Sequence, residues 1–425
     1  MSEAVAKVPL LEGRREWGLF LLAALLLWGL HLAWIYGKYR HFIQRPFYYT
    51  WGEVLEQRIK ANDRGTYRIL RVRTDEGMTL WTRTRHRGDF TYKRVRLQLL
   101  SLDRIDFWDY LKGPFVPSRI KAVAEAPESL RRRLGTAISA QHDSPEMAAF
   151  YRAIFLADPL PPSLREKIAA LGVSHLVALS GFHLGILWGG IFLLLRPLYR
   201  FVQERFFPWR YDLKDLGSFT LLLLGGYLWL TGMPPSLLRA YGMLLLGWSA
   251  LLLGIEIVSF SFLLITGAVL LVLFPSLIVS WGFWLSMSGV FAIFLLLKWW
   301  GDLPGRIVAL AVIPLGVYLL MAPVAHTLFA LANPWQNLSP LLSLLFVPFY
   351  PLALGLHLLG LGGLFDGVLQ WLWSLPGEES YLRQLPIEFL GFYGGLALAA
   401  TRFRWAFYGL LVTAFSAMGM VFFGS

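Results

Sequence analysis

Long apolar runs constrain this chain more than any other feature. Beyond Leu171 they recur at about 173–195, 216–233, 236–254, 256–274, 277–297, 307–325, 338–360, 387–401 and 405–423. Most approach the ~20 residues that a helix needs to cross a bilayer. Because lipid cannot satisfy backbone polar groups, a spanning segment of this kind must be helical. The sequence therefore predicts a polytopic α-helical membrane protein and excludes an ordinary soluble enzyme.

Another apolar run, Trp17–Tyr36, lies near the start of the chain. It is followed by Lys38, Tyr39 and Arg40 rather than by the small residues of a signal-peptide cleavage site. We predict that residues 1–37 form a cytoplasmic N-terminus and a first transmembrane helix. The expected total is about 9–11 transmembrane helices.

Positive charge is concentrated in one segment. The chain has a net charge of +12, and residues 38–143 hold 22 Lys and Arg against 12 Asp and Glu, a surplus of ten. A basic segment favours an anionic partner such as lipid headgroups, phosphate or nucleic acid. The chain contains no cysteine, which excludes disulfides, thiolate nucleophiles and cysteine-ligated metals.

Residues 38–125 show strand patterning instead of long apolar runs. Leu80, Thr82 and Thr84 alternate with larger or charged residues, and so do Val95, Leu97 and Leu99. Period-two alternation is typical of half-buried strands. Glycines at 65, 77 and 88 mark turns. Roughly five short strands predict a small extracytoplasmic β-barrel resembling an OB-fold.

The solvent face of these strands would carry rings among guanidinium groups. Its members are Trp81, Arg83, Arg85, Arg87, Tyr92, Arg94 and Arg96. Bases of single-stranded nucleic acid stack on rings while arginines meet phosphates. Contact with anionic lipid, or plain solvation, explains the same face and is favoured by the face alone, because runs of charge rarely identify their partner.

Residues 126–170 read as amphipathic interfacial helices, with Arg131, Arg132 and Arg133 solvating one of them. Residues 171–425 form the expected polytopic channel domain, in which Asp366–Ser374 is a short amphipathic or re-entrant piece. Basic residues in the 196–215 loop, at 298–306 and at 402–404 predict that these loops are cytoplasmic. The basic 38–125 domain then faces outward.

The densest polar cluster in the membrane part contains His175, Ser180 and His183. A metal pair would lack a third ligand, and a serine nucleophile at Ser180 would need a histidine from another span, such as His326. Polar packing between helices and the lining of a path are the other possibilities. Arg239, a few residues into a span, either snorkels to the interface or contacts phosphate.

Several of these strings occur in the order seen in the ComEC-type competence family. Gly172-Val-Ser-His-Leu-Val-Ala-Leu-Ser-Gly-Phe-His-Leu-Gly185 resembles the family signature, and Pro235 to Met243, with Arg239-Ala240, resembles its Pro-x-x-x-Arg-Ala-x-x-Met segment. Phe283 to Ser286 and Asn337-Leu338 resemble two later motifs, and Phe107-Trp-Asp-Tyr-Leu111 resembles the end of the family's N-terminal OB-like domain.

The resemblance implies an inner-membrane channel that carries single-stranded DNA into the cytoplasm during natural transformation. It implies no enzyme activity, no cofactor and no metal. Many relatives end in a metallo-β-lactamase-like domain, whereas this sequence has no His-x-His-x-Asp-His pattern. We therefore expect a separate nuclease, a periplasmic DNA-capture protein and a cytoplasmic helicase or translocase as partners, beside single-stranded DNA and membrane lipids.

The residues expected to line the channel or shape it are His175, Ser180, Gly181, His183, Arg239, Ser286 and Asn337. No Walker-type Gly-x-x-x-x-Gly-Lys loop is present, so the chain is not expected to be an ATP motor. Two other functions remain open from the sequence. One is an intramembrane serine hydrolase using Ser180, and the other is a small-solute transporter with a lipid-facing basic domain.

Overall fold

The computed structural model describes residues 11, 13–62, 65–86, 88–91, 93–377 and 380–423. The chain divides into two compact units. The sheet unit consists of Glu12–Ser129 with Ala268–Trp281, and the helical unit consists of Leu130–Gly267 with Gly282–Ser425.

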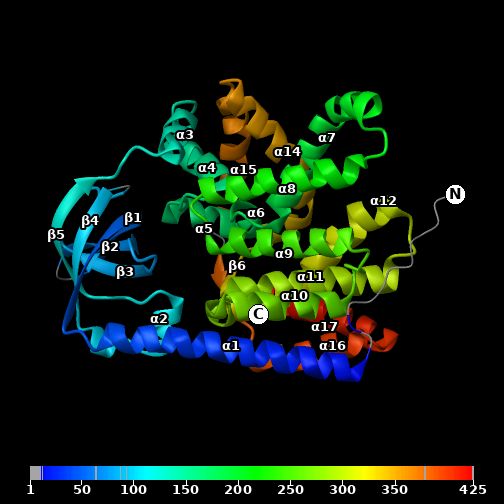
Figure 1. The fold of residues 1–425 in the computed structure, drawn as a ribbon, viewed down its shortest axis with the longest axis horizontal. Helices are drawn as coiled ribbons and strands as arrows, with labels where there is room; N and C mark the ends of the chain where they lie inside the picture. Colours follow the sequence, from blue (N-terminus) through cyan, green and yellow to red (C-terminus); the bar gives the residue numbers. More distant parts are fainter. Residues whose placement is uncertain are drawn as a thin grey trace. The chain divides into compact units, whose positions relative to one another are not determined.

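The sheet unit begins with one long helix, α1 (Arg14–Ile43), which leads into an antiparallel sheet (Figure 1). The strands are β1 (Phe47–Asn62), β2 (Gly65–Thr74), β3 (Thr79–Thr84), β4 (Lys93–Leu100) and β5 (Ser118–Glu125). The short helices η1 (Leu102–Arg104) and α2 (Phe107–Lys112) connect β4 to β5. Asp106 caps α2, because its carboxylate accepts a hydrogen bond from Asp109 N at 2.6 Å.

The predicted alternation is confirmed in this sheet. Leu80, Thr82, Val95, Leu97 and Leu99 are all fully buried. The four aliphatic residues among them form the core together with Val54, Leu70 and Val72. Burying each large aliphatic side chain stabilises the fold by about 1.5–3 kcal/mol.

The strand order is β3-β2-β1-β4-β5. Between β3 and the residues before β5 there is an isolated parallel bridge, Trp81 to Phe115. It is flanked by hydrogen bonds from Trp81 N to Pro114 O and from Val116 N to Trp81 O, at 2.8 and 2.7 Å. No continuous ladder closes the described strands into a barrel, so the coarser description, a small antiparallel sheet, is the one that holds.

The helical unit contains most of the remaining elements. Its first helices are α3 (Leu130–Ser139), α4 (Pro145–Leu156), α5 (Pro162–Ala170), α6 (Ser174–Val177), α7 (Gly181–Phe206), α8 (Asp212–Leu230) and α9 (Pro235–Leu252). The later ones are α11 (Trp281–Trp300), α12 (Gly305–Ile307), η3 (Val308–Val312), α13 (Ile313–Leu328), η4 (Pro334–Leu338), α14 (Ser339–Leu358), η5 (Gly362–Phe365), α15 (Asp366–Ser374), α16 (Glu388–Ala400) and α17 (Arg404–Phe423). A two-residue ladder pairs β6 (Leu331–Ala332) with β7 (Tyr381–Leu382). The remaining elements, helix α10 (Phe260–Leu273) and the turn η2 (Pro275–Val279), lie between α9 and α11 in the sequence.

Six helices in the described part of the chain are long and apolar enough to cross a membrane. They are Arg14–Ile43, Gly181–Phe206, Trp281–Trp300, Gly305–Leu328, Pro334–Leu358 and Arg404–Phe422. Phe260–Leu273 and Glu388–Ala400 are shorter apolar helices. The chain is thus a multi-pass membrane protein, while the larger expected number of spans stays a prediction.

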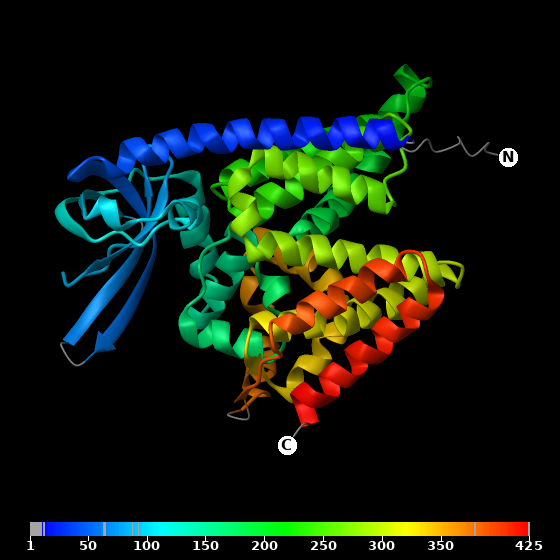
Figure 2. The same cartoon turned by 90° about the horizontal axis from the view of Figure 1, so that it is seen from below.

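Buried aromatic and aliphatic side chains hold the helical unit together. Tyr151, Ile154 and Phe155 of α4 pack with Tyr350 of α14 in the largest of its clusters. Helix α4 is therefore buried along much of its length rather than along one face. Helices α16 and α17 form a hairpin whose two arms lie side by side (Figure 2).

Candidate functional sites

The outward face of the sheet gathers the residues that the alternation singled out. Trp81 stands opposite Arg71, and Arg96 stands opposite Trp51. Arg83 and Arg96 are exposed, while both tryptophans are partly covered. Strand pairing therefore interleaves arginines and rings across four strands instead of segregating them.

Five arginines lie over aromatic rings on this surface. Arg58 lies 4.9 Å and Arg71 5.6 Å from the ring centre of Trp81. Arg83 lies 5.7 Å from Tyr67, and Arg94 and Arg96 each lie 5.8 Å from Trp51 and Tyr49 respectively. We call this surface the arginine–aromatic face; it consists of Tyr49, Trp51, Arg58, Tyr67, Arg71, Trp81, Arg83, Arg94 and Arg96.

Carboxylates neutralise only part of this face. Glu56 accepts a hydrogen bond from Arg58 at 2.5 Å, and Asp75 pairs with Arg94 at 2.5 Å. Among the described residues, Arg83 and Arg96 form no ion pair with a carboxylate. Guanidinium groups that stack on rings and keep charge toward solvent suit a phosphate backbone with exposed bases.

The structure extends the predicted residue set. Trp81, Arg83, Arg94 and Arg96 lie on the arginine–aromatic face, and Arg85 follows β3 in an exposed coil. Arg87 and Tyr92 lie outside the described residues. The sequence patterns did not single out Tyr49, Trp51, Arg58, Tyr67 and Arg71, although the i, i+2 spacing of Tyr49 and Trp51 is itself a strand signal.

In the helical unit, the Gly172–Gly185 segment, which holds the dense polar cluster, does not form one continuous helix. Helix α6 ends at Val177, and Ser180 is extended, with φ −139° and ψ 180°, before α7 begins at Gly181. His175 and His183 therefore do not share one continuous helix.

Ser180 and His183 form the N-terminal cap of α7. Ser180 N donates a hydrogen bond to His183 Nδ1 at 3.3 Å, and Ser180 Oγ lies at the same distance from that nitrogen. The histidine is fully buried against the rings of Phe346 and Tyr350. A residue three places into the helix that reaches back to the N-cap is the arrangement of a capping box.

The Pro235–Met243 segment, which contains Arg239 and Ala240, packs against the chain where α6 ends and α7 begins. A Cβ added at Gly181 would lie 3.6 Å from the Cβ of Ala240, so the start of α7 packs against α9. A Cβ at Gly282 would lie 3.0 Å from Arg239 Nη2, so a larger residue at this position would require the guanidinium group to move slightly. Gly181 thus lies beside Ala240, and Arg239 lies beside Gly282, the residue before the Phe283–Ser286 motif.

Residues that follow the Asn337-Leu338 motif contact the start of the Gly172–Gly185 segment. Ser339 Oγ donates to Gly172 O at 3.0 Å, and His175 Nε2 lies 3.3 Å from Ser343 Oγ. Asn337 accepts a hydrogen bond from Tyr318 OH at 3.0 Å. No hydrogen bond joins Ser286 to these residues in the described part of the chain.

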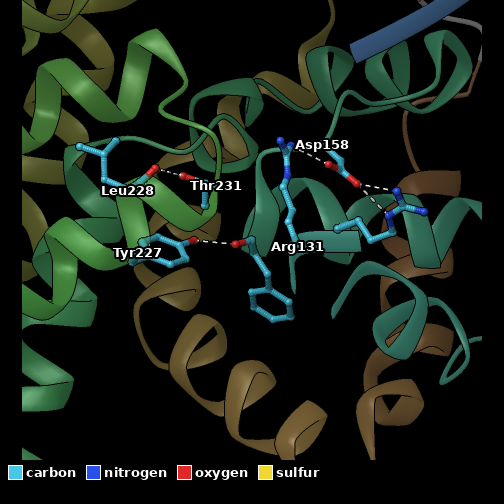
Figure 3. A network of polar contacts seen from close by, with 7 residues as sticks. Arg131, Asp158, Tyr227, Leu228 and Thr231 are labelled. Atoms are coloured by element: carbon cyan, nitrogen blue, oxygen red, sulfur yellow. Dashed lines mark hydrogen bonds and ion pairs between the residues drawn. The ribbon is translucent and has the colours of Figure 1, made fainter. Parts of the chain in front are cut away.

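An acidic residue anchors two arginines just ahead of this region. Asp158 pairs with Arg131 of α3 at 2.8 Å and with Arg152 of α4 at 2.6 Å (Figure 3). Tyr227 OH donates to Phe155 O at 2.7 Å, which ties α8 to the end of α4 (Figure 3). Arg131 therefore packs in an ion-pair network as well as meeting solvent.

The hydrolase alternative gains little from this geometry. His326 contacts the ring of Phe422 and no contact with Ser180 is found among the described residues. No carboxylate bonded to His183 is found there either. Within the described ranges, the His183 ring is therefore without the carboxylate that orients the histidine of a Ser-His-Asp triad.

Comparison with known proteins identifies the helical unit. The model of the Competence protein family matches residues 157–424. The chain belongs to this family. It is also 30% identical over 217 residues to the uncharacterized protein YcaI of Escherichia coli (strain K12), covering 47% of this chain. The alignment spans 28% of that relative's length, and no solved structure matches.

Proposed function

We propose that this protein carries single-stranded DNA across the bacterial inner membrane during natural transformation, as a channel rather than an enzyme. Family membership supports a role in DNA uptake. The observation that carries the proposal is the meeting of the motif segments at the break before α7. Ser180 is partly exposed there and Gly181 is exposed beside Ala240 of α9, the residue that follows Arg239.

A broken helix suits a path for a polyanion. Irregular backbone at membrane depth is tolerated where it lines a cavity or is buried in protein. Arg239 supplies a planar guanidinium that matches phosphate geometry. His183, being buried, holds Ser180 and the start of α7 in place rather than facing the strand itself.

The sheet unit would take up the strand as an OB-like domain. Its strand order and the bridge from Trp81 to Phe115 follow the neighbour pattern of a five-stranded barrel with one incomplete seam. The arginine–aromatic face offers stacking and charge without base-specific donors, which suits a strand of any sequence. In this proposal the sheet unit is extracytoplasmic, and a separate nuclease, a DNA-capture protein and a cytoplasmic translocase act with the channel.

The test is deletion of the gene in a transformable host, complemented with variants. Deletion is expected to abolish transformation while leaving surface capture of labelled DNA intact. Complementation with Ser180→Ala should restore transformation, because the main chain still donates to His183. Normal transformation in the deletion strain would overturn the channel proposal, and loss of function in Ser180→Ala with normal protein levels would favour the hydrolase.

A further inference from the structure

Two histidines and a carboxylate meet in the helical unit, away from the motif segments. His142 Nδ1 lies 2.9 Å from Asp366 Oδ2, and His142 Nε2 lies 3.0 Å from His357 Nε2. They come from the loop between α3 and α4, from α15 and from the end of α14. The His142 side chain is completely buried. We call these three residues the histidine cluster.

The hydrogen positions follow from the partners. His357 Nδ1 lies 2.7 Å from Ala353 O, and because a carbonyl oxygen only accepts, this nitrogen carries a hydrogen. A neutral imidazole has a single N–H, so His357 Nε2 is an acceptor. The hydrogen between the two rings must then sit on His142 Nε2.

The other nitrogen of His142 faces the Asp366 carboxylate. A hydrogen must lie between them too, since an ionised carboxylate and a bare ring nitrogen would both be acceptors. Three hydrogen bonds thus need three hydrogens, whereas two neutral imidazoles supply two. The histidine cluster therefore holds one further proton, which lies between His142 Nδ1 and the Asp366 carboxylate.

A metal ion fits this spacing less well than a proton. The 3.0 Å between the two Nε2 atoms is normal for a hydrogen bond. Two zinc–nitrogen bonds of about 2.0–2.1 Å at a tetrahedral angle would hold the nitrogens about 3.3 Å apart. In the described ranges no group of three His, Cys, Asp or Glu residues is arranged to hold a metal.

The surroundings cover the two rings of the histidine cluster, while the Asp366 side chain stays 17% exposed. Tyr151 stacks on His142 with ring centres 4.5 Å apart, and Phe155 contacts the ring of His357. A Cβ at Gly362 would lie 2.7 Å from His357 Nε2, so this approach leaves no room for water. Burial, helped by the charge of Asp366, raises the pKa of Tyr151, so its phenol stays neutral and exchanges no proton with the cluster. The nearest other ionisable side chain in sequence, Asp143, is exposed.

We propose that His142, His357 and Asp366 form a proton-binding site that fastens the α3–α4 loop to α14 and α15. Loss of the proton leaves one of two contacts without a hydrogen. It is either the contact between His142 and the Asp366 carboxylate or the contact between His142 and His357. A second proton, on His357 Nε2, removes the acceptor of the hydrogen bond from His142. Both changes weaken the attachment, so the loop is released at acid and at alkaline pH and held between them. This inference does not depend on the transported substrate.

A spin label reports the attachment directly. Because the chain has no cysteine, Asp143→Cys gives a single labelling position on the exposed residue beside His142. The full chain is labelled at neutral pH in lipid nanodiscs, and label mobility is then recorded across pH. We expect an immobile label near neutral pH and a mobile one on both sides. A control label at Arg402→Cys, in an exposed turn, should show no such profile.

Asp366→Asn, made in the Asp143→Cys background, separates proton binding from simple packing. The asparagine amide can donate to His142 Nδ1 while His142 Nε2 still donates to His357, so all bonds form without the further proton. Alkaline release should disappear while acid release remains, and Asp366→Ala should free the label at every pH. A flat wild-type profile, or alkaline release persisting in Asp366→Asn, would overturn the proposal. Release by a chelator, reversed by zinc, would replace the proton with a metal.

Discussion

At the scale of single residues, the segment around Ser180 combines a buried helix cap with an exposed helix start. The sequence marks Ser180, Gly181 and His183 as one polar cluster, and the structure separates their parts. His183 is fully buried and bonds the main chain of Ser180, whereas Gly181 faces outward at the start of α7. The histidine is thus a positioning residue for the break in the helix.

His183→Gln should preserve this cap, because glutamine at the third helical position is a usual capping-box partner. His183→Ala removes the acceptor and should lower the free energy of unfolding by about 1–2 kcal/mol. Thermal unfolding of the purified variants and transformation frequency in cells measure the two effects. If both variants lose transformation while both remain as stable as the wild type, His183 contributes more than a cap.

At the scale of elements, the strands of the sheet place arginines and aromatic rings together on the arginine–aromatic face. Arg96 is exposed and stands opposite Trp51, while Arg104 lies in η1, off the face. The two arginines are equal in charge and differ only in position. They form a matched pair for testing whether the face contacts the phosphate backbone.

Arg96→Gln is expected to weaken binding of single-stranded DNA to the full-length protein and to reduce the salt dependence. Each lost phosphate contact on a single strand lowers the slope of log K against log salt by about 0.7. Arg104→Gln should leave the slope unchanged, and fluorescence anisotropy at several salt concentrations measures it. Equal slopes for both variants would place the DNA contact elsewhere.

The hairpin between α7 and α8 has its own acid response. Arg196 and Arg200 hydrogen-bond to Asp212 and hold its pKa below the usual value, and Arg210 with Tyr199 does the same for Asp215. A carboxylate with a depressed pKa stabilises the fold above its unfolded pKa and loses this effect as pH falls through the folded pKa.

We therefore expect the 207–215 turn to stay protected from hydrogen exchange through the pH range where ordinary aspartates begin to protonate. Protection should be lost only in stronger acid, and mass spectrometry with correction for intrinsic exchange rates measures it. Asp212→Asn should lower this protection already at neutral pH. Loss of wild-type protection at the ordinary aspartate pKa would contradict the assignment.

Sequence patterns predicted the positions of helices and strands better than the contacts between them. The apolar run at 405–423 became α17 (Arg404–Phe423), and the alternation of Leu80 and Thr82 became the buried side of β3. The run at 173–195 is instead divided, because Ser180 and His183 cap a new helix start. The meeting of His142 with His357 joins positions 215 residues apart, which local periodicity cannot encode.

At the scale of the whole molecule, the positions of the basic turns bear on the predicted membrane topology. Lys298 Nζ donates to Thr401 O at 2.6 Å, and Trp299 Nε1 donates to Ala400 O at 2.9 Å. The end of α11 therefore lies beside the turn between α16 and α17. The positive residues at 298–306 and 402–404 share one end of the helical unit, as their expected placement on one side of the membrane requires.

The absence of cysteine makes this topology directly testable with single introduced thiols. Trp209→Cys and Arg402→Cys occupy exposed turns expected in the cytoplasm, and Arg85→Cys follows β3 in the sheet unit. A membrane-impermeant maleimide added to intact spheroplasts should label only Arg85→Cys, and permeabilisation should expose the other two, because the bilayer keeps the reagent from the cytoplasmic side. Labelling of Trp209→Cys and Arg402→Cys on opposite sides would break the positive-inside assignment. Labelling of Arg85→Cys only after permeabilisation would place the arginine–aromatic face inside, where it would meet the strand after passage instead of before it.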